Sequence, residues 1–150
     1  MSICFVMQED SDFHKTNGVA RHLLLGQVGE EIAANWLMGN GYRILDRNWK
    51  LKGSYELDII AFKDNLIHFI EVKTRDRSAN SNPLSAIDKR KLFHVFRAGM
   101  LYKKYHRLDF DSVMHAISIV YGSDTDYELK FIPNIHQAMT AMGYYGHKHH

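Results

Sequence analysis

Acidic residues within two apolar segments are the strongest indication of chemistry in this chain. Residues 56–75 read ELDIIAFKDNLIHFIEVKTR. The first apolar segment carries Glu56 and Asp58, and the second carries Glu71 followed two positions later by Lys73. Mg²⁺ and Mn²⁺ prefer oxygen ligands, and a bound cation activates water for attack on phosphorus. Paired carboxylates beside a lysine are therefore typical of a metal-dependent phosphodiesterase site.

A β-hairpin would bring these side chains together. Residues 57–62 and 66–74 are rich in Ile, Leu, Phe and Val, which predicts two strands. Between them, Asp64 and Asn65 tolerate the positive φ that a tight hairpin turn needs. We therefore expect a two-residue turn at these positions, which fixes the register of the strands.

This register decides which charged side chains share a face. Counting outward from the turn places Asp58 opposite Glu71, with their Cβ atoms roughly 5 Å apart. Alternation along the strand puts Lys73 on the face of Glu71, and Glu56 lies near the same patch. A slip of one residue would send one acid to the opposite face. The alternative is a half-exposed hairpin whose acids and lysine form surface salt bridges.

Two further charges are expected on apolar helix faces. Residues 19–38 predict a helix, and Glu30 lies on its small, apolar stripe formed by Gly26, Ala33, Ala34 and Leu37. A buried acid needs a metal, a lysine or hydrogen bonds. The alternative is that Glu30 is an acid on the helix surface, at the rim of the sheet. A second helix, from Pro83 to about Tyr105, places Lys91 among Ile87, Val95 and Ala98. Lys91 either reaches inward, to the scissile phosphate or to the acids, or extends outward from its stripe.

The remaining segments complete one α/β domain. Residues 43–49, 111–121 and 128–132 predict further strands, and residues 76–82 predict a polar loop. The order α-β-β-β-α-β-β predicts a mixed β-sheet with helices packed on it. We expect a flexible N-terminal arm over residues 1–18, the domain over residues 19–136 and a C-terminal tail over residues 137–150.

Composition sets weaker limits on function. Hydrophobic residues make up 45% and charged residues 24% of the 150-residue chain, which are ordinary values for a globular domain. The net charge of +2 gives only weak support for nucleic-acid binding. Basic residues nevertheless cluster along the chain, and clusters also fit solvated surfaces. The expected nucleic-acid contacts are Arg47, Arg75, Arg77, Lys89 and Arg90.

Targeting signals are absent from the sequence pattern. Cys4 is the one cysteine, which excludes an intrachain disulfide and fits a reducing cytoplasm. No apolar run reaches the ~18 residues that a membrane span needs. The first residues lack the pattern of a signal peptide. We therefore expect a cytoplasmic protein that does not enter the membrane.

Several sequence blocks occur in a recognisable order. They are GQVGEEIAANWL (26–37), GYRILDRNW (41–49), ELDIIA (56–61), FIEVKTR (69–75), then Pro83, Ala86, Ile87 and Lys91, and finally Phe110, Asp111 and Val113. Over roughly residues 20–136 the chain resembles the YraN-like family of small bacterial proteins, within the PD-(D/E)XK nuclease superfamily that includes archaeal Holliday-junction resolvases. One departure is Tyr55, which stands where the family usually has a glycine.

The resemblance implies a restriction-endonuclease-like fold and a nuclease site. It implies Asp58, Glu71 and Lys73 as catalytic residues, Glu30, Asp58 and Glu71 as ligands for Mg²⁺ or Mn²⁺, and Glu56 and Lys91 as supporting residues. The expected reaction is hydrolysis of phosphodiester bonds in nucleic acid. DNA is favoured over RNA, with branched DNA as a candidate substrate and a homodimer as the form that cuts two strands.

Two other functions fit the same sequence, because a fold does not determine a function. The first is a non-catalytic module that binds nucleic acid or acts as an adaptor, for which the hairpin acids would be dispensable. The second is a structural partner of other proteins. Such a partner would show no salt-sensitive affinity for nucleic acid.

Overall fold

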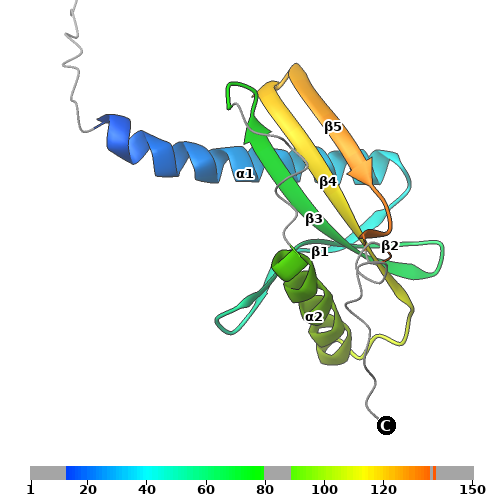
Figure 1. Ribbon diagram of the computed structural model, residues 1–150. Coiled ribbons are helices and arrows are strands. Elements are labelled where there is room, and N and C mark those ends of the chain that lie inside the picture. Colours follow the sequence, from blue (N-terminus) through cyan, green and yellow to red (C-terminus); the bar gives the residue numbers. More distant parts are fainter. Residues whose placement is uncertain (1–12, 80–88, 136, 138–150) are drawn as a thin grey trace, which may run out of the picture.

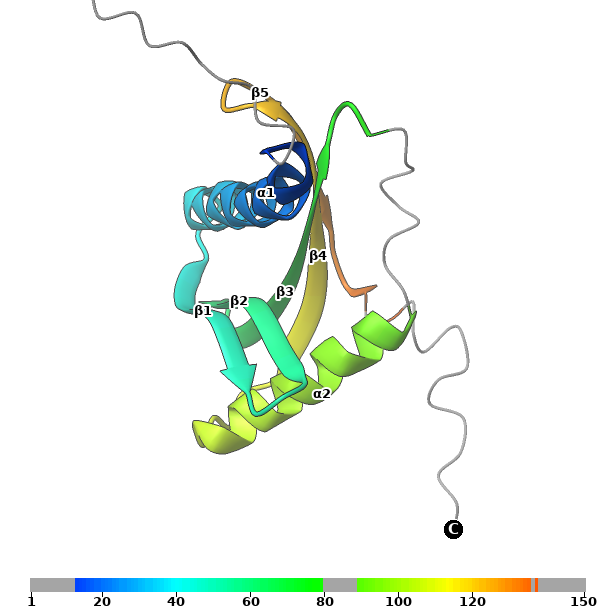
Figure 2. The same ribbon diagram turned by 90° about the vertical axis from the view of Figure 1, so that its left-hand side faces the viewer.

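A five-stranded mixed sheet with a helix on each face forms the described part of the protein (Figures 1 and 2). The computed structural model describes residues 13–79, 89–135 and 137. Its elements are α1 (Phe13–Gly39), β1 (Arg43–Leu51), β2 (Tyr55–Lys63), β3 (Leu66–Asp76), α2 (Lys89–Tyr105), β4 (Ser112–Ser123) and β5 (Asp126–Ile132). The predicted α/β class and the order α-β-β-β-α-β-β are confirmed.

The strands lie in chain order across the sheet, β1-β2-β3-β4-β5. Neighbouring strands are antiparallel except β3 and β4, which are parallel. A parallel pair needs a crossover connection, and α2 lies within the segment that joins these two strands. The single parallel pair makes the sheet mixed, as the sequence predicts.

The turn between β2 and β3 confirms the predicted register. Asp64 and Asn65 have φ values of 51° and 63°, the left-handed conformation that a two-residue hairpin turn requires. Lys63 pairs with Leu66, and the pairing continues in step to Ile59 and Ile70. Asp58 and Glu71 are the next positions along the two strands.

Apolar residues fill a separate core on each face of the sheet. On one face, Leu92, Val95 and Ala98 of α2 pack with residues that include Phe69 of β3. On the other face, Ala33, Ala34 and Leu37 of α1 pack with Ile59, Ile70, Ile117 and Ile119. The faces of α1 and α2 that were predicted to be apolar are therefore the faces that contact the sheet. The same packing fixes each helix beside the acids of the hairpin.

The first helix begins at Phe13, six residues before the predicted start at Val19. The apolar pattern begins near Val19, but continuing a helix adds one hydrogen bond for each further residue. Gly18 within the helix costs only about 1 kcal/mol, so it does not stop the helix. Residues 1–12 of the expected arm, the expected start of the second helix at Pro83 and most of the expected tail lie outside the described residues. In Figure 1, the N-terminal half of α1 extends beyond the sheet.

Two buried histidines form a chain of hydrogen bonds at one end of the sheet. The backbone N–H of Asn134 donates to His115 Nδ1 at 3.0 Å, so His115 carries its proton on Nε2. That proton is donated to His68 Nδ1 at 2.8 Å, and His68 Nε2–H donates to the carbonyl of Lys63 at 3.0 Å. Both rings are neutral in this arrangement. Burial and the neighbouring His68 lower the pKa of His115 to about 4.

No helix within the described ranges is long and apolar enough to cross a membrane.

Candidate acidic site between the two helices

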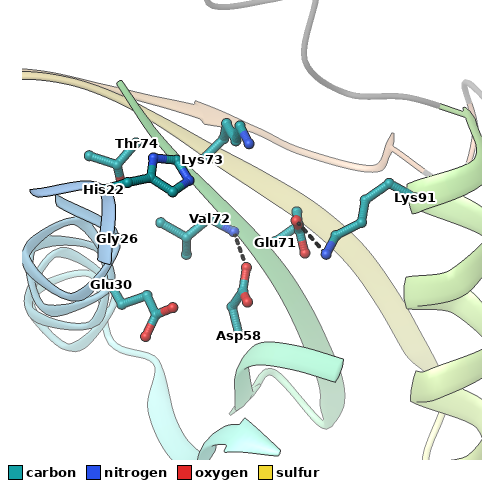
Figure 3. A pocket seen from close by; sticks show the side chains of 9 residues that line it. All are labelled: His22, Gly26, Glu30, Asp58, Glu71, Val72, Lys73, Thr74 and Lys91. Carbon is teal, nitrogen blue, oxygen red and sulfur yellow. Dashed lines mark hydrogen bonds and ion pairs between the residues drawn. The ribbon is translucent and has the colours of Figure 1, made fainter. Parts of the chain in front are cut away.

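Asp58 and Glu71 form the centre of the candidate site (Figure 3). Asp58 is only 8% exposed, and its Oδ2 accepts a hydrogen bond of 2.8 Å from the backbone N–H of Val72. The side chain of Glu71 is 12% exposed and is hydrogen-bonded to Asp58. The hairpin register therefore brings the two acids into direct contact, as the turn predicts.

Two largely buried carboxyl groups in contact repel each other when both are ionised. Burial raises the pKa of Asp58, although the N–H of Val72 opposes the shift by hydrogen-bonding to the carboxylate. Burial and the negative charge of Asp58 raise the pKa of Glu71 to about 8. The pair therefore retains a proton at neutral pH, and an added cation would take over the role of that proton.

Lys91 of α2 supplies a positive charge to this pair. Its Nζ lies 3.5 Å from Glu71 Oε1, and its side chain is 47% exposed. Burial lowers the pKa of Lys91, but the charges of Glu71 and Asp58 outweigh it and the net shift is upward. Lys91 thus reaches the acids from the edge of its apolar stripe, which was one of the two arrangements that the sequence left open.

Glu30 approaches from the opposite side, on α1. Figure 3 shows its carboxylate pointing toward Asp58, with Glu71 beyond Asp58. Burial raises the pKa of Glu30, a hydrogen bond to the Asn48 side chain opposes the shift, and the charge of Asp58 adds to it. Glu31, the next residue, is exposed and forms an ion pair with Arg47 of β1 at 2.9 Å. The helix therefore separates one inward acid from one outward acid, as predicted.

Asn48 is a site residue that the sequence analysis missed. It lies in β1 between the pairs that Arg47 and Trp49 form with β2, so it faces the position of Asp58. Its φ is 50°, a left-handed conformation that asparagine adopts more readily than most residues. An asparagine within a predicted strand was the available signal, since it indicates a local break in regular pairing.

A glycine allows α1 to lie directly on β3. A Cβ atom at Gly29 would be 1.6 Å from Thr74 Oγ1 and 2.7 Å from Thr74 Cβ. No other amino acid fits without moving the helix or the strand. Because Glu30 follows Gly29, this close approach also sets how far Glu30 reaches toward the hairpin acids.

A cleft of about 380 Å³ lies over these residues. It is lined by His22, Gly26, Glu30, Asp58, Glu71, Val72, Lys73, Thr74 and Lys91. The structure thus brings the three predicted metal ligands and both site lysines to one cleft. The other four lining residues, His22, Gly26, Val72 and Thr74, were not predicted, because their place in the cleft depends on how α1 packs on β3.

Lys73 and Glu56 take more peripheral positions. Lys73 is exposed and lines the cleft. Glu56 is exposed, is not among the residues that line the cleft and forms an ion pair with Lys50 at 3.5 Å. Its negative charge still contributes to raising the pKa values of Asp58 and Glu30. Glu56 therefore acts on the site through its charge.

The carboxylates of the cleft supply part of the coordination that a divalent cation needs. Among the described residues, no group of three or more His, Cys, Asp and Glu side chains is arranged to hold a metal ion. Mg²⁺, however, is usually bound by one or two carboxylates, and waters and substrate phosphates complete its octahedron. The contacting pair of Asp58 and Glu71 fits that smaller requirement, with Glu30 on the far side of Asp58.

The five residues predicted to contact nucleic acid are scattered over the molecule. Arg47 is paired with Glu31, and Arg77 forms ion pairs with Asp126 at 3.2 Å and Glu128 at 3.0 Å. Arg75 is half-buried on β3, and Arg90 is exposed on α2. Lys89 is the first residue of α2. Only Arg90 and Lys89 lie on the helix that carries Lys91.

Tyr55 does not narrow the cleft. It begins β2, packs against the core beneath α2 and lies with its ring centroid 6.2 Å from that of His94 on α2. It is not among the residues that line the cleft. The tyrosine in place of the usual family glycine therefore contacts α2 and leaves the acid pair accessible.

The fold and cleft define an α/β protein with a buried carboxylate pair between two helices. The chain belongs to the uncharacterised protein family UPF0102, whose model matches residues 29–114. It is 35% identical over 114 residues to a UPF0102 protein of Bacteroides thetaiotaomicron, covering 76% of this chain and 93% of that protein. A UPF0102 protein of Clostridium botulinum is 37% identical over 116 residues, covering 75% and 94%. The predicted membership of the YraN-like family is confirmed.

Proposed function

We propose that this protein is a metal-dependent nuclease that hydrolyses phosphodiester bonds in nucleic acid. The observation that carries the proposal is the contact between Asp58 and Glu71, two buried acids on adjacent strands within a cleft that also contains lysines. Burying like charges together is costly for a fold, so such pairs are concentrated at functional sites. DNA is favoured over RNA, and branched DNA cut by a homodimer is the candidate substrate.

The residues have distinct roles in this proposal. Asp58 and Glu71 would hold Mg²⁺ or Mn²⁺, and Glu30 would complete the acidic wall from α1. Such a cation lowers the pKa of a bound water and offsets negative charge on the phosphate. Lys73, exposed in the cleft, would orient the attacking water or neutralise a phosphate oxygen. Lys91 would keep the carboxylate of Glu71 in position.

The reaction is a hydrolysis without a covalent intermediate. An oxygen from water forms a bond to phosphorus while the bond from phosphorus to one ester oxygen breaks. The leaving oxygen gains a proton, and the attacking water loses one to the solvent. The role of the protein is to position the phosphate and to offset the charge that develops on it, which is the main catalytic contribution in phosphoryl transfer.

Metal titration by calorimetry, combined with a cleavage assay, tests the proposal. Wild-type protein should bind Mn²⁺ and cut one of four substrates: single-stranded, duplex or four-way-junction DNA, or RNA. Asp58→Asn and Glu71→Gln should abolish cutting and weaken metal binding, whereas nucleic-acid binding should persist. Glu30→Gln should weaken metal binding, while Glu31→Gln, one residue away and exposed, serves as the matched control. Cutting that survives in both Asp58→Asn and Glu71→Gln would contradict the proposal.

One observation favours the alternative of a non-catalytic module that binds nucleic acid. The acids in the described residues do not form a three-membered metal cluster, and Lys91 together with a shared proton already compensates the pair. In that case wild-type protein would bind nucleic acid but neither Mn²⁺ nor Mg²⁺. Asp58→Asn would then leave binding unchanged.

A further inference from the structure

The helix α2 is strongly basic for its length. Its 17 residues, KRKLFHVFRAGMLYKKY, contain six lysines and arginines and no Asp or Glu. A solvated helix usually mixes charges of both signs, since oppositely charged neighbours stabilise it. The cations on the exposed face of this helix therefore have no acid within the helix to pair with.

Five exposed side chains of α2 form one stripe. Spacings of three and four residues place Arg90, Phe93, Arg97, Met100 and Lys104 on one face, opposite the buried Leu92, Val95 and Ala98. Cationic and apolar residues alternate along this stripe. Phe93 is 38% exposed and Met100 is 41% exposed. At 1.5 Å per residue, the stripe is about 21 Å long.

The stripe begins at the end of α2 that carries Lys91, on the helix face turned away from the sheet. Lys91 lies one position after Arg90, at the same end of α2, and forms the ion pair with Glu71. The surface of α1, the other helix at the cleft, differs from that of α2 in exposing the apolar side chains of Val19, Leu23 and Leu24. The positive charge on the α2 side of the cleft therefore continues onto the outer face of α2.

We infer that the stripe of Arg90, Phe93, Arg97, Met100 and Lys104 binds a single-stranded segment of the nucleic acid whose phosphodiester occupies the cleft. The three cations contact phosphates, and the apolar side chains contact bases. This inference rests on the proposed function and names the form of its substrate.

The alternation of the two residue types favours a single strand over a duplex. Proteins that bind single strands combine a basic track with aromatic side chains on which bases stack. A duplex offers such side chains no exposed base face along its backbone. Arg97 lies over the Phe93 ring at 5.6 Å from its centroid, and a guanidinium plane is itself a surface for base stacking. Only two apolar side chains interrupt the cations, which is too few for insertion into a lipid surface.

Fluorescence anisotropy with a labelled 20-nucleotide oligo(dT) and a 20-base-pair duplex, in EDTA, tests this inference without cleavage. Arg97→Ala/Lys104→Ala should weaken binding of the single strand and reduce the slope of log K against log salt by about 1.4, since each phosphate contact contributes about 0.7. Phe93→Ala should weaken single-strand binding roughly fivefold or more and leave the duplex unchanged.

A matched control uses two cations that lie outside α2. Arg43 of β1 is exposed and lies over the Phe62 ring at 5.5 Å from its centroid, so its setting resembles that of Arg97. Lys130 of β5 is also exposed. Arg43→Ala/Lys130→Ala removes the same charge as the α2 double variant and should change the salt slope less.

The outcomes separate this inference from the proposed function. The inference would be overturned if both double variants lost single-strand affinity equally. It would also be overturned if Phe93→Ala lowered the duplex affinity as much as the single-strand affinity. The inference would also be overturned if Arg97→Ala/Lys104→Ala weakened binding to phosphatidylserine vesicles but left oligonucleotide binding unchanged. If only the α2 variants lose single-strand binding, and the wild-type protein cuts no substrate, the inference holds and the nuclease proposal fails. If cutting requires Asp58 but the α2 variants match the control, the inference alone fails.

Discussion

The close approach of α1 to β3 predicts that Gly29→Ala destabilises the protein. The added Cβ would lie 1.6 Å from Thr74 Oγ1, 2.7 Å from its Cβ and 2.9 Å from its Cγ2. Rotation of the threonine side chain can move Oγ1 and Cγ2, but not Cβ. Thr74 pairs with Ile119 in the β3–β4 ladder, so moving its Cβ means moving a central strand. The helix must therefore shift instead.

The expected loss of stability is the balance of two opposing contributions. Overpacking of this kind costs about 1–3 kcal/mol, and the upper half of that range applies because backbone-linked atoms collide. Replacing glycine by alanine within a helix returns about 1 kcal/mol. The free energy of unfolding should therefore fall by about 1–2 kcal/mol. For a chain of this size, that corresponds to a decrease in Tm of roughly 2–8 °C.

Urea and thermal unfolding of Gly29→Ala and Gly18→Ala measure this difference. A Cβ at Gly18, on the same helix, meets no atom within 4 Å, so that variant should gain stability. Adding Thr74→Ala to Gly29→Ala should recover part of the loss, because Oγ1 and Cγ2 are then absent. A Gly29→Ala protein as stable as Gly18→Ala would refute the reasoning. The shift of α1 should also displace Glu30 and weaken Mn²⁺ binding.

Three further predictions concern titrating groups and charge. Because the pKa of Glu71 is raised to about 8, the folded state binds more protons than the unfolded state between about pH 4.5 and 8. Its contribution to the free energy of unfolding is therefore lost as pH rises through that window, and urea unfolding of Glu71→Gln should not show this loss. His115 gives the opposite pH dependence, because its lowered pKa makes the unfolded state bind more protons between about pH 6.5 and 4. The free energy of unfolding should therefore fall as pH falls through this window, by at most about 1.4 kcal/mol per pH unit. Urea unfolding of His115→Gln should show a smaller fall. Lys91→Met removes a cation that competes at Glu71, so calorimetry should show tighter Mn²⁺ binding while cleavage slows; weaker Mn²⁺ binding would contradict this.

The centre of the site was predictable from the sequence because it depends on local geometry. A two-residue turn at Asp64 and Asn65 fixes the register, and the register brings Asp58 and Glu71 together. Helical periodicity likewise separated inward-facing Glu30 from exposed Glu31. Each of these predictions uses residues that are close in sequence, where spacing determines direction.

The periphery of the site was not predictable in the same way. Thr74 reaches the cleft only because Gly29 lets α1 lie on β3, and these two residues are 45 positions apart. The contact of Asn48 with Glu30 needs both a left-handed residue and the final position of α1. Such contacts depend on how the elements pack, which the period of a sequence pattern does not specify.

The arrangement of charge implies that this site opposes the stability of the fold. Asp58 and Glu71 are buried in contact, and one proton together with Lys91 compensates for their charge. A glutamine at position 71 would keep the shape of the side chain and remove the need for that proton, so natural selection for stability alone would not favour the acid. A carboxylate pair that survives at such a cost needs a reason beyond folding. Under the proposed function, recruiting a divalent cation to a nucleic-acid backbone would supply one, since the bound cation would replace both the proton and the attraction of Lys91.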